Sequence, residues 1–323
     1  IDVKKKIEEE CDAIQRSINL EKGTLVKEAI FKTENDKLLM LCIHHLVVDG
    51  VSWRIIAEDF TTAMEQINNN IEVKLPKKTV SYKEWAEAIN EYGTKMHERE
   101  RNYWNALIKK ENVNIQYKKT NRIATEKNAY CEVSFSKELT EKVMMKSGKA
   151  CGAKINEVLL SAIAKAIGKI TGQKEVGINI EGHGRENLND DIETDRTVGW
   201  FTAIYPIVLP CVEDTRKSII SAKELMRSVP NGGVGYGCLF LGQKKIAPDI
   251  TFNYLGDMDE VGDNTTYDIG REIAEENRTN DKILINGMVK NKYLYFSFEC
   301  FEQNFSLEFI KEFAERFKES VEE

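Results

Sequence analysis

The first third of the chain alternates between helical and strand-like spacing of its apolar residues. Apolar positions three and four residues apart open the chain and predict an amphipathic helix. These positions are Val3, Ile7, Cys11, Ile14 and Ile18. Apolar runs at residues 25–32 and 38–46 predict two strands joined by a polar turn. Helical periodicity then returns at residues 53–67 and, with an aromatic stripe typical of a protein core, at residues 82–110.

The second half mixes strands and helices without a regular repeat. Strands are predicted at residues 130–135, 176–181, 202–209 and 250–255 and as a hairpin at 283–300, and helices at 138–151, 156–170, 216–229 and 307–321. This order predicts mixed sheets covered by helices rather than a doubly wound parallel sheet. Residues 111–129, rich in Lys and Asn, are the predicted linker. We therefore predict two domains, residues 1–128 and 129–323.

Composition indicates a soluble globular protein. Hydrophobic residues make up 41% and charged residues 31% of the 323 positions, and no apolar run approaches the length of a membrane span. The net charge of -7 argues against nonspecific nucleic-acid binding but leaves a local basic patch open. Seven cysteines without a CxxC pair predict reduced thiols and a cytoplasmic location. The polar N-terminal stretch is unlike a signal peptide.

HHLVVDG, residues 44–50, places two of the four histidines at the end of a predicted strand. If the strand stays extended, His44 and His45 point to opposite faces, so only one can face a given cavity. A zinc ion held by both is therefore disfavoured. Gly50 permits an abrupt turn, and Asp49 can accept a hydrogen bond or pair with a cation. A structural and a catalytic histidine are equally good interpretations of this stretch alone.

EGHGRE, residues 181–186, follows a second predicted strand. Alternation along that strand puts Ile180 on one face and Glu181 on the other. Gly182 and Gly184 would let the backbone approach a ligand held beside this carboxylate. Taken alone, the stretch favours a polar turn with exposed charges over a binding site.

Three further stretches combine glycine with aromatic residues. PNGGVGYG, residues 230–237, follows a helix and so lacks the context of a dinucleotide-binding loop, which leaves a tight turn or a flexible lid. FNYLG, residues 252–256, places Asn253 and Tyr254 on opposite faces of a strand. RTVGWFTAIYP, residues 196–206, indicates a turn that enters a buried strand.

Together, HHLVVDGVSW, EGHGRE, TVGWFTAIYP, PNGGVGYG and FNYLG, in this order and at these separations, resemble the epimerization domains of nonribosomal peptide synthetases. These domains belong to the condensation-domain superfamily. The resemblance implies an α/β fold with mixed sheets, like chloramphenicol acetyltransferase, whose two lobes enclose an active-site tunnel. Family members begin well before this chain does, with a PIQxWF-like motif. The first lobe is therefore expected to be incomplete and to expose apolar surface.

The resemblance also implies a reaction. Epimerization domains invert, from L to D, the α-carbon of an aminoacyl or peptidyl thioester on the phosphopantetheine arm of a peptidyl carrier protein, beside neighbouring synthetase domains. No intrinsic cofactor or metal is implied. Inversion needs a base on one side of the α-carbon and an acid on the other. Matching the motifs assigns these roles to His45 and Glu181, and which residue is the base stays open.

The same matching assigns supporting roles. Asp49 is expected to be structural and to pair with Arg185. Asn253 is expected to hold the thioester oxygen or to order the acid, with Tyr254 also lining the site, whereas His44 is assigned to packing. Two alternatives stay open. A condensation enzyme would form amides with His45 and would not need Glu181, and a non-catalytic fragment would bind the carrier protein without turnover.

Overall fold

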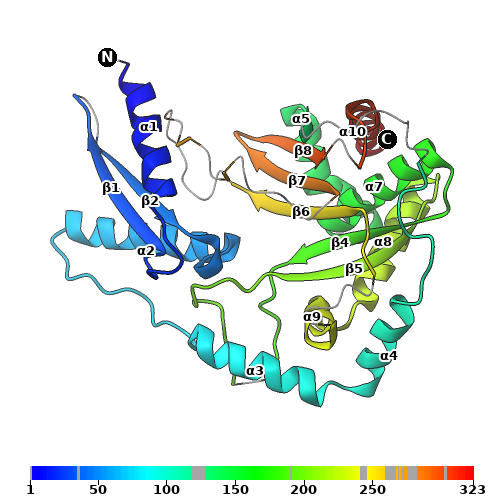
Figure 1. Cartoon of the computed structure of the whole chain (residues 1–323), viewed down its shortest axis with the longest axis horizontal. Helices are drawn as coiled ribbons and strands as arrows, with labels where there is room; N and C mark the ends of the chain where they lie inside the picture. Colours follow the sequence, from blue (N-terminus) through cyan, green and yellow to red (C-terminus); the bar gives the residue numbers. More distant parts are fainter. Residues whose placement is uncertain are drawn as a thin grey trace. The chain divides into compact units, whose positions relative to one another are not determined.

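The fold is known from a computed structural model, which describes residues 2–34, 37–117, 128–189, 191–240, 246–258, 267, 269–270, 273–274, 282–301 and 304–323. The chain forms two compact units (Figure 1). Unit 1 comprises Ile1–Tyr82, Thr194–Phe201 and Val261–Thr279, and unit 2 comprises Lys83–Glu193, Thr202–Glu260 and Asn280–Glu323. The boundaries of these compact units differ from the predicted boundary after residue 128. The division into lobes 1–128 and 129–323 stays a prediction.

Unit 1 contains an antiparallel strand pair and two long helices. Its elements are α1 (Val3–Arg16), β1 (Val26–Lys32), β2 (Lys37–Ile43), the 3₁₀ turn η1 (His45–Val47) and α2 (Gly50–Asn68). The Asp2 side chain caps α1 by accepting the Lys4 N–H at 3.1 Å. Ile7 and Cys11 of α1 are buried, and α1 contacts both strands. The predicted helix and strand pair are confirmed.

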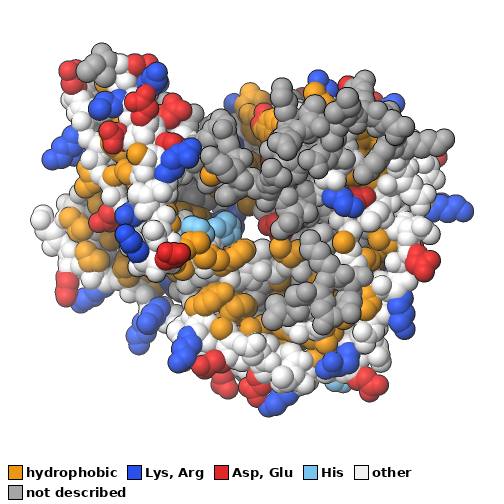
Figure 2. All heavy atoms as spheres, in the orientation of Figure 1, with side chains coloured by type: hydrophobic (Ala, Val, Ile, Leu, Met, Phe, Trp, Pro, Cys, Tyr) orange, Lys and Arg blue, Asp and Glu red, His pale blue; other side chains and the backbone are white. Residues whose placement is uncertain are grey.

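Apolar side chains remain exposed on unit 1. They lie on the strand pair and on α2, and they include Val26, Ile30, Leu39, Phe60, Met64 and Ile67. Figure 2 shows apolar side chains, in orange, among the charged ones over this unit. Apolar side chains grouped in this way are surface that another segment or a partner can cover. The incomplete first lobe expected from the sequence stays a prediction.

Unit 2 is built on a six-stranded mixed sheet with the strand order β3-β8-β7-β6-β4-β5. The strands are β3 (Asn128–Ser134), β4 (Glu175–Gly182), β5 (Ala203–Pro210), β6 (Ile250–Asp257), β7 (Ile283–Lys290) and β8 (Tyr293–Phe301). β6 runs parallel to both β4 and β7, and the other neighbours are antiparallel. The predicted mixed sheet and the predicted hairpin, β7–β8, are confirmed.

Helices accompany the sheet of unit 2, and several of them pack against its strands. They are α3 (Tyr82–Lys95), α4 (Glu98–Leu107), α5 (Lys137–Lys142), the π-helical turn η2 (Val143–Ser147), α6 (Gly148–Cys151), α7 (Ile155–Thr171), α8 (Thr215–Ser228), η3 (Pro230–Gly233), α9 (Val234–Phe240) and α10 (Leu307–Glu322). α7 packs against α8 and α10 (Figure 1). The Phe298 ring of β8 lies 5.3 and 5.6 Å from the rings of Phe313 and Phe317 of α10.

The predicted single helix over residues 82–110 is wrong, because α3 and α4 are separated at Met96 and His97. His97 adopts an extended conformation, and its Nδ1 accepts the Arg99 N–H at 3.1 Å, so it caps α4. Met96 is buried in the core of unit 2. A cap inside a periodic stretch ends one helix and begins another without disturbing the apolar pattern.

The predicted linker, residues 111–129, is wrong where the structure describes it. Val113 and Ile115 are buried in the core of unit 2. The Val113 carbonyl accepts the Gly177 N–H at 2.7 Å, and the Ile115 N–H donates to Asp249 Oδ2 at 2.9 Å. These residues therefore belong to unit 2, while residues 118–127 of the predicted linker lie outside the described residues.

None of the helices among the described residues is long and apolar enough to cross a bilayer. All seven cysteines are free thiols. Burial raises the pKa of Cys211 to about 12, and a nearby Glu175 carboxylate acts in the same direction. Cys211 is therefore an inert packing thiol.

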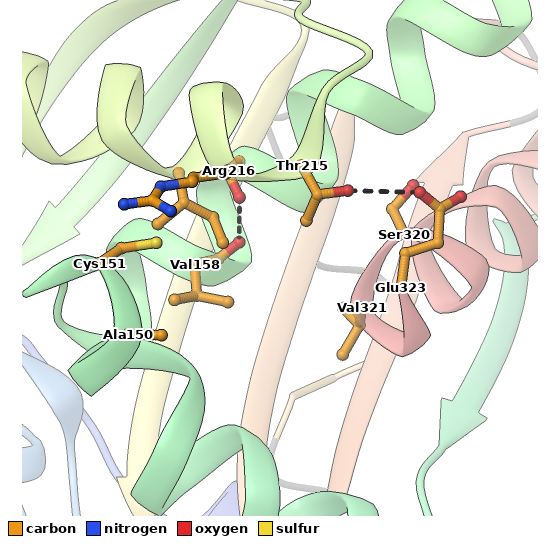
Figure 3. A pocket seen from close by; sticks show the side chains of 10 residues that line it. Ala150, Cys151, Val158, Thr215, Arg216, Ser320, Val321 and Glu323 are labelled. Carbon is orange, nitrogen blue, oxygen red and sulfur yellow. Dashed lines mark hydrogen bonds between the residues drawn. The ribbon is translucent and has the colours of Figure 1, made fainter.

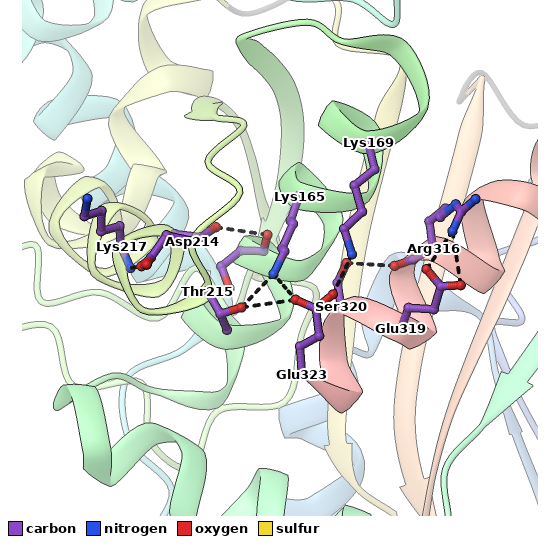
Figure 4. A network of polar contacts seen from close by, with 11 residues as sticks. Lys165, Lys169, Asp214, Thr215, Lys217, Arg316, Glu319, Ser320 and Glu323 are labelled. Carbon is purple, nitrogen blue, oxygen red and sulfur yellow. Dashed lines mark hydrogen bonds and ion pairs between the residues drawn. The ribbon is translucent and has the colours of Figure 1, made fainter.

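A buried ammonium fastens α7 to the last residue of the chain (Figure 4). The side chain of Lys165 is 4% exposed, donates to Thr215 Oγ1 at 2.6 Å and pairs with Glu323. Lys169 donates to the same carboxylate at 2.6 Å. These two lysines lower the pKa of Glu323 to about 2.

Replacing this carboxylate should destabilise unit 2 in a pH-dependent way. Because the pKa of Glu323 lies below its usual 4.5, the stabilisation is complete above pH 4.5 and is lost as the pH falls towards 2. We expect Glu323→Gln to lower the free energy of unfolding at pH 7 by about 1–2 kcal/mol, less than for a fully buried pair because Glu323 is partly exposed. Urea unfolding from pH 7 to 3 measures this difference. Glu319→Gln, which removes an exposed partner of Arg316, is the control, and an equal effect of both variants at all pH values would contradict the account.

Candidate active site

In unit 1, the strand that carries the histidines ends before them. β2 stops at Ile43, and residues 45–47 form the 3₁₀ turn η1. His44 Nδ1 accepts the Leu46 N–H at 3.1 Å and caps this turn. The prediction that an extended strand would send the two side chains to opposite faces is therefore wrong in its premise. His44, assigned to packing, is half-buried and also caps this turn, and His45 is exposed at the start of the turn.

Asp49 is a structural residue at the start of α2. It is buried, and its Oδ1 accepts the Ser52 N–H at 2.7 Å as the N-cap of the helix. Its Oδ2 accepts the Phe201 N–H at 3.2 Å. Ser52 Oγ also donates to the Gly199 carbonyl at 2.9 Å. The first turn of α2 thus holds the TVGWF stretch in place by direct hydrogen bonds.

This attachment brings Trp200 beside His45. The two ring centroids lie 5.1 Å apart at an interplanar angle of 66°. Both rings are exposed, and within the described chain the His45 imidazole makes no hydrogen bond. An edge-on aromatic contact restricts the orientation of the imidazole but leaves its nitrogens able to transfer protons. Sequence reasoning missed the Trp200 contact, although Trp200 lies in a stretch already singled out.

In unit 2, Glu181 lies near the end of β4, opposite Ile204 of β5. Ile180 is buried towards the helices, so Glu181 points to the other face of the sheet, as predicted, and is half-buried there. On the same face, the Asn179 side chain of β4 donates to Thr251 Oγ1 of the parallel strand β6 at 3.4 Å. The last paired residues of these two strands are Ile180 and Phe252. Glu181 and Asn253 follow directly after that pair, near the carboxyl end of β4 and in the middle of β6.

The turn after Glu181 is fixed by its own side chains. Gly184 adopts φ 68°, and His183 Nδ1 accepts the Arg185 N–H at 3.0 Å. His183 Nε2 lies 3.3 Å from Glu186 Oε1. The EGHGRE stretch thus forms a polar turn, as predicted from this stretch taken alone. Glu181 precedes the turn and lies near the end of β4.

The PNGGVGYG stretch is a tight turn, η3, followed by the short helix α9. Gly233 adopts φ 87°, and a Cβ atom built there would overlap the Tyr205 ring of β5. A Cβ atom at Gly232 would likewise meet the Glu186 side chain. Burial and the Glu186 carboxylate raise the pKa of Tyr205 to about 12. The sequence left a tight turn or a flexible lid open, and the described geometry is that of a tight turn. This turn packs against Glu186 of the EGHGRE stretch.

A side chain at Gly233 should destabilise unit 2. We expect Gly233→Ala to lower the free energy of unfolding by about 2–5 kcal/mol, because left-handed backbone strain and overpacking against Tyr205 act together. Gly237→Ala, four residues on and with nothing within 4 Å of its Cβ position, is the matched control and should change it by less than about 1 kcal/mol. Urea midpoints measure both, and equal midpoints would contradict the close contact.

The remaining predicted residues are placed as follows. Tyr254 points to the opposite face of β6 from Asn253, and its hydroxyl donates to Met144 Sδ at 3.3 Å. Arg185 is half-buried in the turn after Glu181. His45 and Asp49 belong to unit 1, whereas the other four predicted site residues belong to unit 2. The pairing of Asp49 with Arg185 and of His45 with Glu181 joins the two units and stays a prediction.

A cavity of about 320 Å³ lies elsewhere in unit 2. It is bordered by α6, α7, α8 and the end of α10, and none of the predicted site residues lines it (Figure 3). Cys151, Arg216 and Glu323 are among its lining residues. In the part of the chain that the structure describes, no three His, Cys, Asp or Glu side chains gather as metal ligands.

Comparison with known proteins defines the family. The model of the condensation domain matches residues 1–323. The chain is 35% identical to surfactin synthase subunit 1 of Bacillus subtilis (strain 168) over 98% of its length, and 34% identical to gramicidin S synthase 1 of Brevibacillus brevis over 97%. It spans 9% and 31%, respectively, of these relatives.

The solved structures that share the fold include an epimerization domain and a condensation domain. The epimerization domain from the third module of tyrocidine synthetase B is 31% identical, with a TM-score of 0.85 over 99% of this chain and 76% of that one. The first condensation domain of the calcium-dependent antibiotic synthetase is 20% identical, with a TM-score of 0.67 over 92% of this chain and 66% of that one. The chain belongs to the condensation-domain family. Its predicted place in the superfamily of nonribosomal peptide synthetase domains and its predicted mixed α/β fold are confirmed.

Proposed function

We propose that the chain epimerises, from L to D, the α-carbon of an aminoacyl or peptidyl thioester carried by a peptidyl carrier protein. The observation that carries this proposal is the 31% identity and TM-score of 0.85 to an epimerization domain, over 99% of the chain. The order Gly50, Val51, Ser52, Trp53 and the EGHGRE and FNYLG stretches favour the same branch of the family.

The proposed chemistry is proton removal and return at the α-carbon. A thioester makes its α-proton more acidic than an ester or amide does, but removal near neutral pH still needs a positioned base, which contributes about 10²- to 10⁴-fold. A donor aimed at the enolate oxygen adds about 10²- to 10³-fold. Inversion then requires an acid on the opposite side of the carbon. The phosphopantetheine arm that presents the substrate is the only prosthetic group this chemistry requires, and it belongs to the carrier.

Glu181 and Asn253 support one half of the proposed site. A half-buried carboxylate at a strand end can take or give a proton, and the neighbouring Asn253 amide can donate a hydrogen bond to the thioester oxygen. The Glu181 side chain lies on the sheet face away from the helical core. A substrate held on this face would not disturb the packing of Ile180.

His45 supports the other half. Its imidazole is exposed, restrained by Trp200 and without a hydrogen bond among the described residues. Asp49, by contrast, caps α2 and accepts a backbone hydrogen bond from Phe201, so we assign it no part in proton transfer.

The other supporting residues keep their proposed roles. Arg185 as the partner of Asp49 and Tyr254 as a residue lining the site remain part of the proposal. Neighbouring synthetase domains in the cytoplasm complete the proposed setting.

Chirality of the product tests the proposal. The chain is incubated with a carrier protein loaded with an L-aminoacyl phosphopantetheine thioester, the thioester is hydrolysed, and the amino acid is resolved on a chiral column. We expect D-amino acid to accumulate until the two forms approach equilibrium. A parallel reaction contains a second carrier loaded with a different amino acid, so that an amide-forming activity is also detected.

Each result separates the alternatives. D-amino acid without dipeptide supports epimerization, and dipeptide without D-amino acid supports a condensation enzyme. Carrier binding with neither product supports the non-catalytic fragment. The last two results would each overturn the proposal.

A further inference from the structure

A row of polar residues crosses the face of the unit 2 sheet that carries Glu181. Asn253 of β6 pairs with Asn286 of β7, and Asn286 pairs with Ser297 of β8. Paired residues of neighbouring strands point to the same face. The row therefore runs from Glu181 through these three residues towards the far edge of the sheet.

The positions one step earlier form the opposite kind of row. Phe252, Ile285 and Phe298 are mutual partners across the same three strands and are at most 2% exposed beneath the helices. Alternation then places Asn253, Asn286 and Ser297 on the face away from the helical core. The polar residues are therefore confined to one face of these strands, and the opposite face is apolar.

The side chains of this row have unused hydrogen-bonding groups. Asn253, Asn286 and Ser297 are each half-buried, and none of them makes a side-chain hydrogen bond to the rest of the described chain. Asn179, on the same face of β4, does donate to Thr251. Half-buried amides without protein partners are suited to a ligand that brings its own donors and acceptors.

Strand spacing shows which part of a substrate each residue can reach. With strands about 4.8 Å apart, Asn253, Asn286 and Ser297 lie about 5, 10 and 14 Å from Glu181 across the sheet. An extended peptide advances about 3.3 Å per residue. For an acyl chain that follows this row with its reacting α-carbon beside Glu181, a distance of about 10 Å corresponds to about three residues. Asn286 is then level with the peptide groups two to three residues upstream of the reacting one.

We infer that Asn286 binds the peptide group upstream of the reacting residue and so favours peptidyl over aminoacyl thioesters as substrates. Its amide offers both a donor and an acceptor, the pair that a peptide group complements. This inference rests on the proposed function and names the substrate class of the same site. Asn286 lies outside every motif that carried the family resemblance.

The test compares two substrates that differ only upstream of the reacting residue. The full chain is given a carrier protein loaded with L-alanyl or with glycyl-glycyl-L-alanyl phosphopantetheine, and D-alanine formation yields KM and kcat. We expect Asn286→Ala to raise KM for the tripeptidyl carrier about 3- to 10-fold, with KM for the alanyl carrier and both kcat values within about twofold. Asn179→Ala, the same substitution on the same face but off the row, should change neither KM more than about twofold.

The outcomes separate the inference from the function it rests on. If wild type epimerises neither substrate, the proposed function is lost and the inference with it. If wild type epimerises both and Asn286→Ala raises the two KM values equally, or raises neither, only the inference is overturned. An equal KM increase in Asn179→Ala, or a wild type that epimerises only the alanyl carrier, also overturns it. Should wild type accept only the tripeptidyl carrier, a KM increase confined to Asn286→Ala supports it.

Discussion

Glu181→Gln should slow the formation of D-amino acid on an aminoacyl carrier by about 10²- to 10⁴-fold, the contribution expected of a positioned acid or base. Glutamine keeps the size and the hydrogen-bonding oxygen of the side chain but cannot transfer the proton. Glu181 is half-buried on the face away from the helical core. The substitution should therefore change the free energy of unfolding of unit 2 by less than about 1 kcal/mol. The Kd for the loaded carrier should stay within about twofold of the wild-type value.

Glu175→Gln is the matched control for this variant. Glu175 begins the same strand, is exposed and pairs with Lys110 at 2.8 Å. Its loss should leave the rate of epimerization unchanged. A Glu181→Gln rate within tenfold of wild type, with the control also unchanged, would remove Glu181 from the proton-transfer step.

His45→Ala is expected to have an effect of the same size on the rate, about 10²- to 10⁴-fold. The imidazole is exposed at the start of a 3₁₀ turn and packs only edge-on against Trp200 among the described rings. Its removal leaves β2, the His44 cap and the Asp49 cap of α2 in place. We therefore expect an unchanged thermal midpoint, so that the lost rate reports chemistry rather than unfolding.

His97→Ala provides the comparison for His45→Ala. His97 caps α4 and is not among the predicted site residues. We expect it to lower the free energy of unfolding by about 0.5–2 kcal/mol without a comparable loss of rate. The assignment of His45 would be wrong if its variant retained most of the wild-type rate while remaining folded.

Most of the secondary structure could be predicted because helix and strand periods differ. The strands of the unit 2 sheet and the helices α7, α8 and α10 occur where the apolar pattern placed them. The break between α3 and α4 could not be found this way, because His97 caps the second helix within an uninterrupted pattern. Likewise, the polar composition around Val113 concealed two core residues.

The candidate site likewise has features that could be predicted from the sequence and features that could not. Strand alternation was sufficient to put Glu181 and Asn253 on one face, because period-two geometry is local. The end of β2 at Ile43 was not predictable, because a 3₁₀ turn capped by His44 replaces the last residues of the expected strand. The contact of Trp200 with His45 and the attachment of the TVGWF stretch to α2 join residues about 150 positions apart, as in the Asp49–Phe201 hydrogen bond. No periodicity reports such a contact.

The most direct measurement is the deuterium content of the α-carbon early in the wild-type reaction. An L-aminoacyl carrier is incubated with the chain in deuterated water, and both the D-product and the remaining L-substrate are analysed by mass spectrometry after chiral separation. A base on one side and an acid on the other predict one solvent deuterium in nearly every D-product and almost none in the L-substrate at first. D-product that retains its original proton would contradict two-sided proton transfer, and the absence of any D-product would contradict the assignment of this chain as an epimerase.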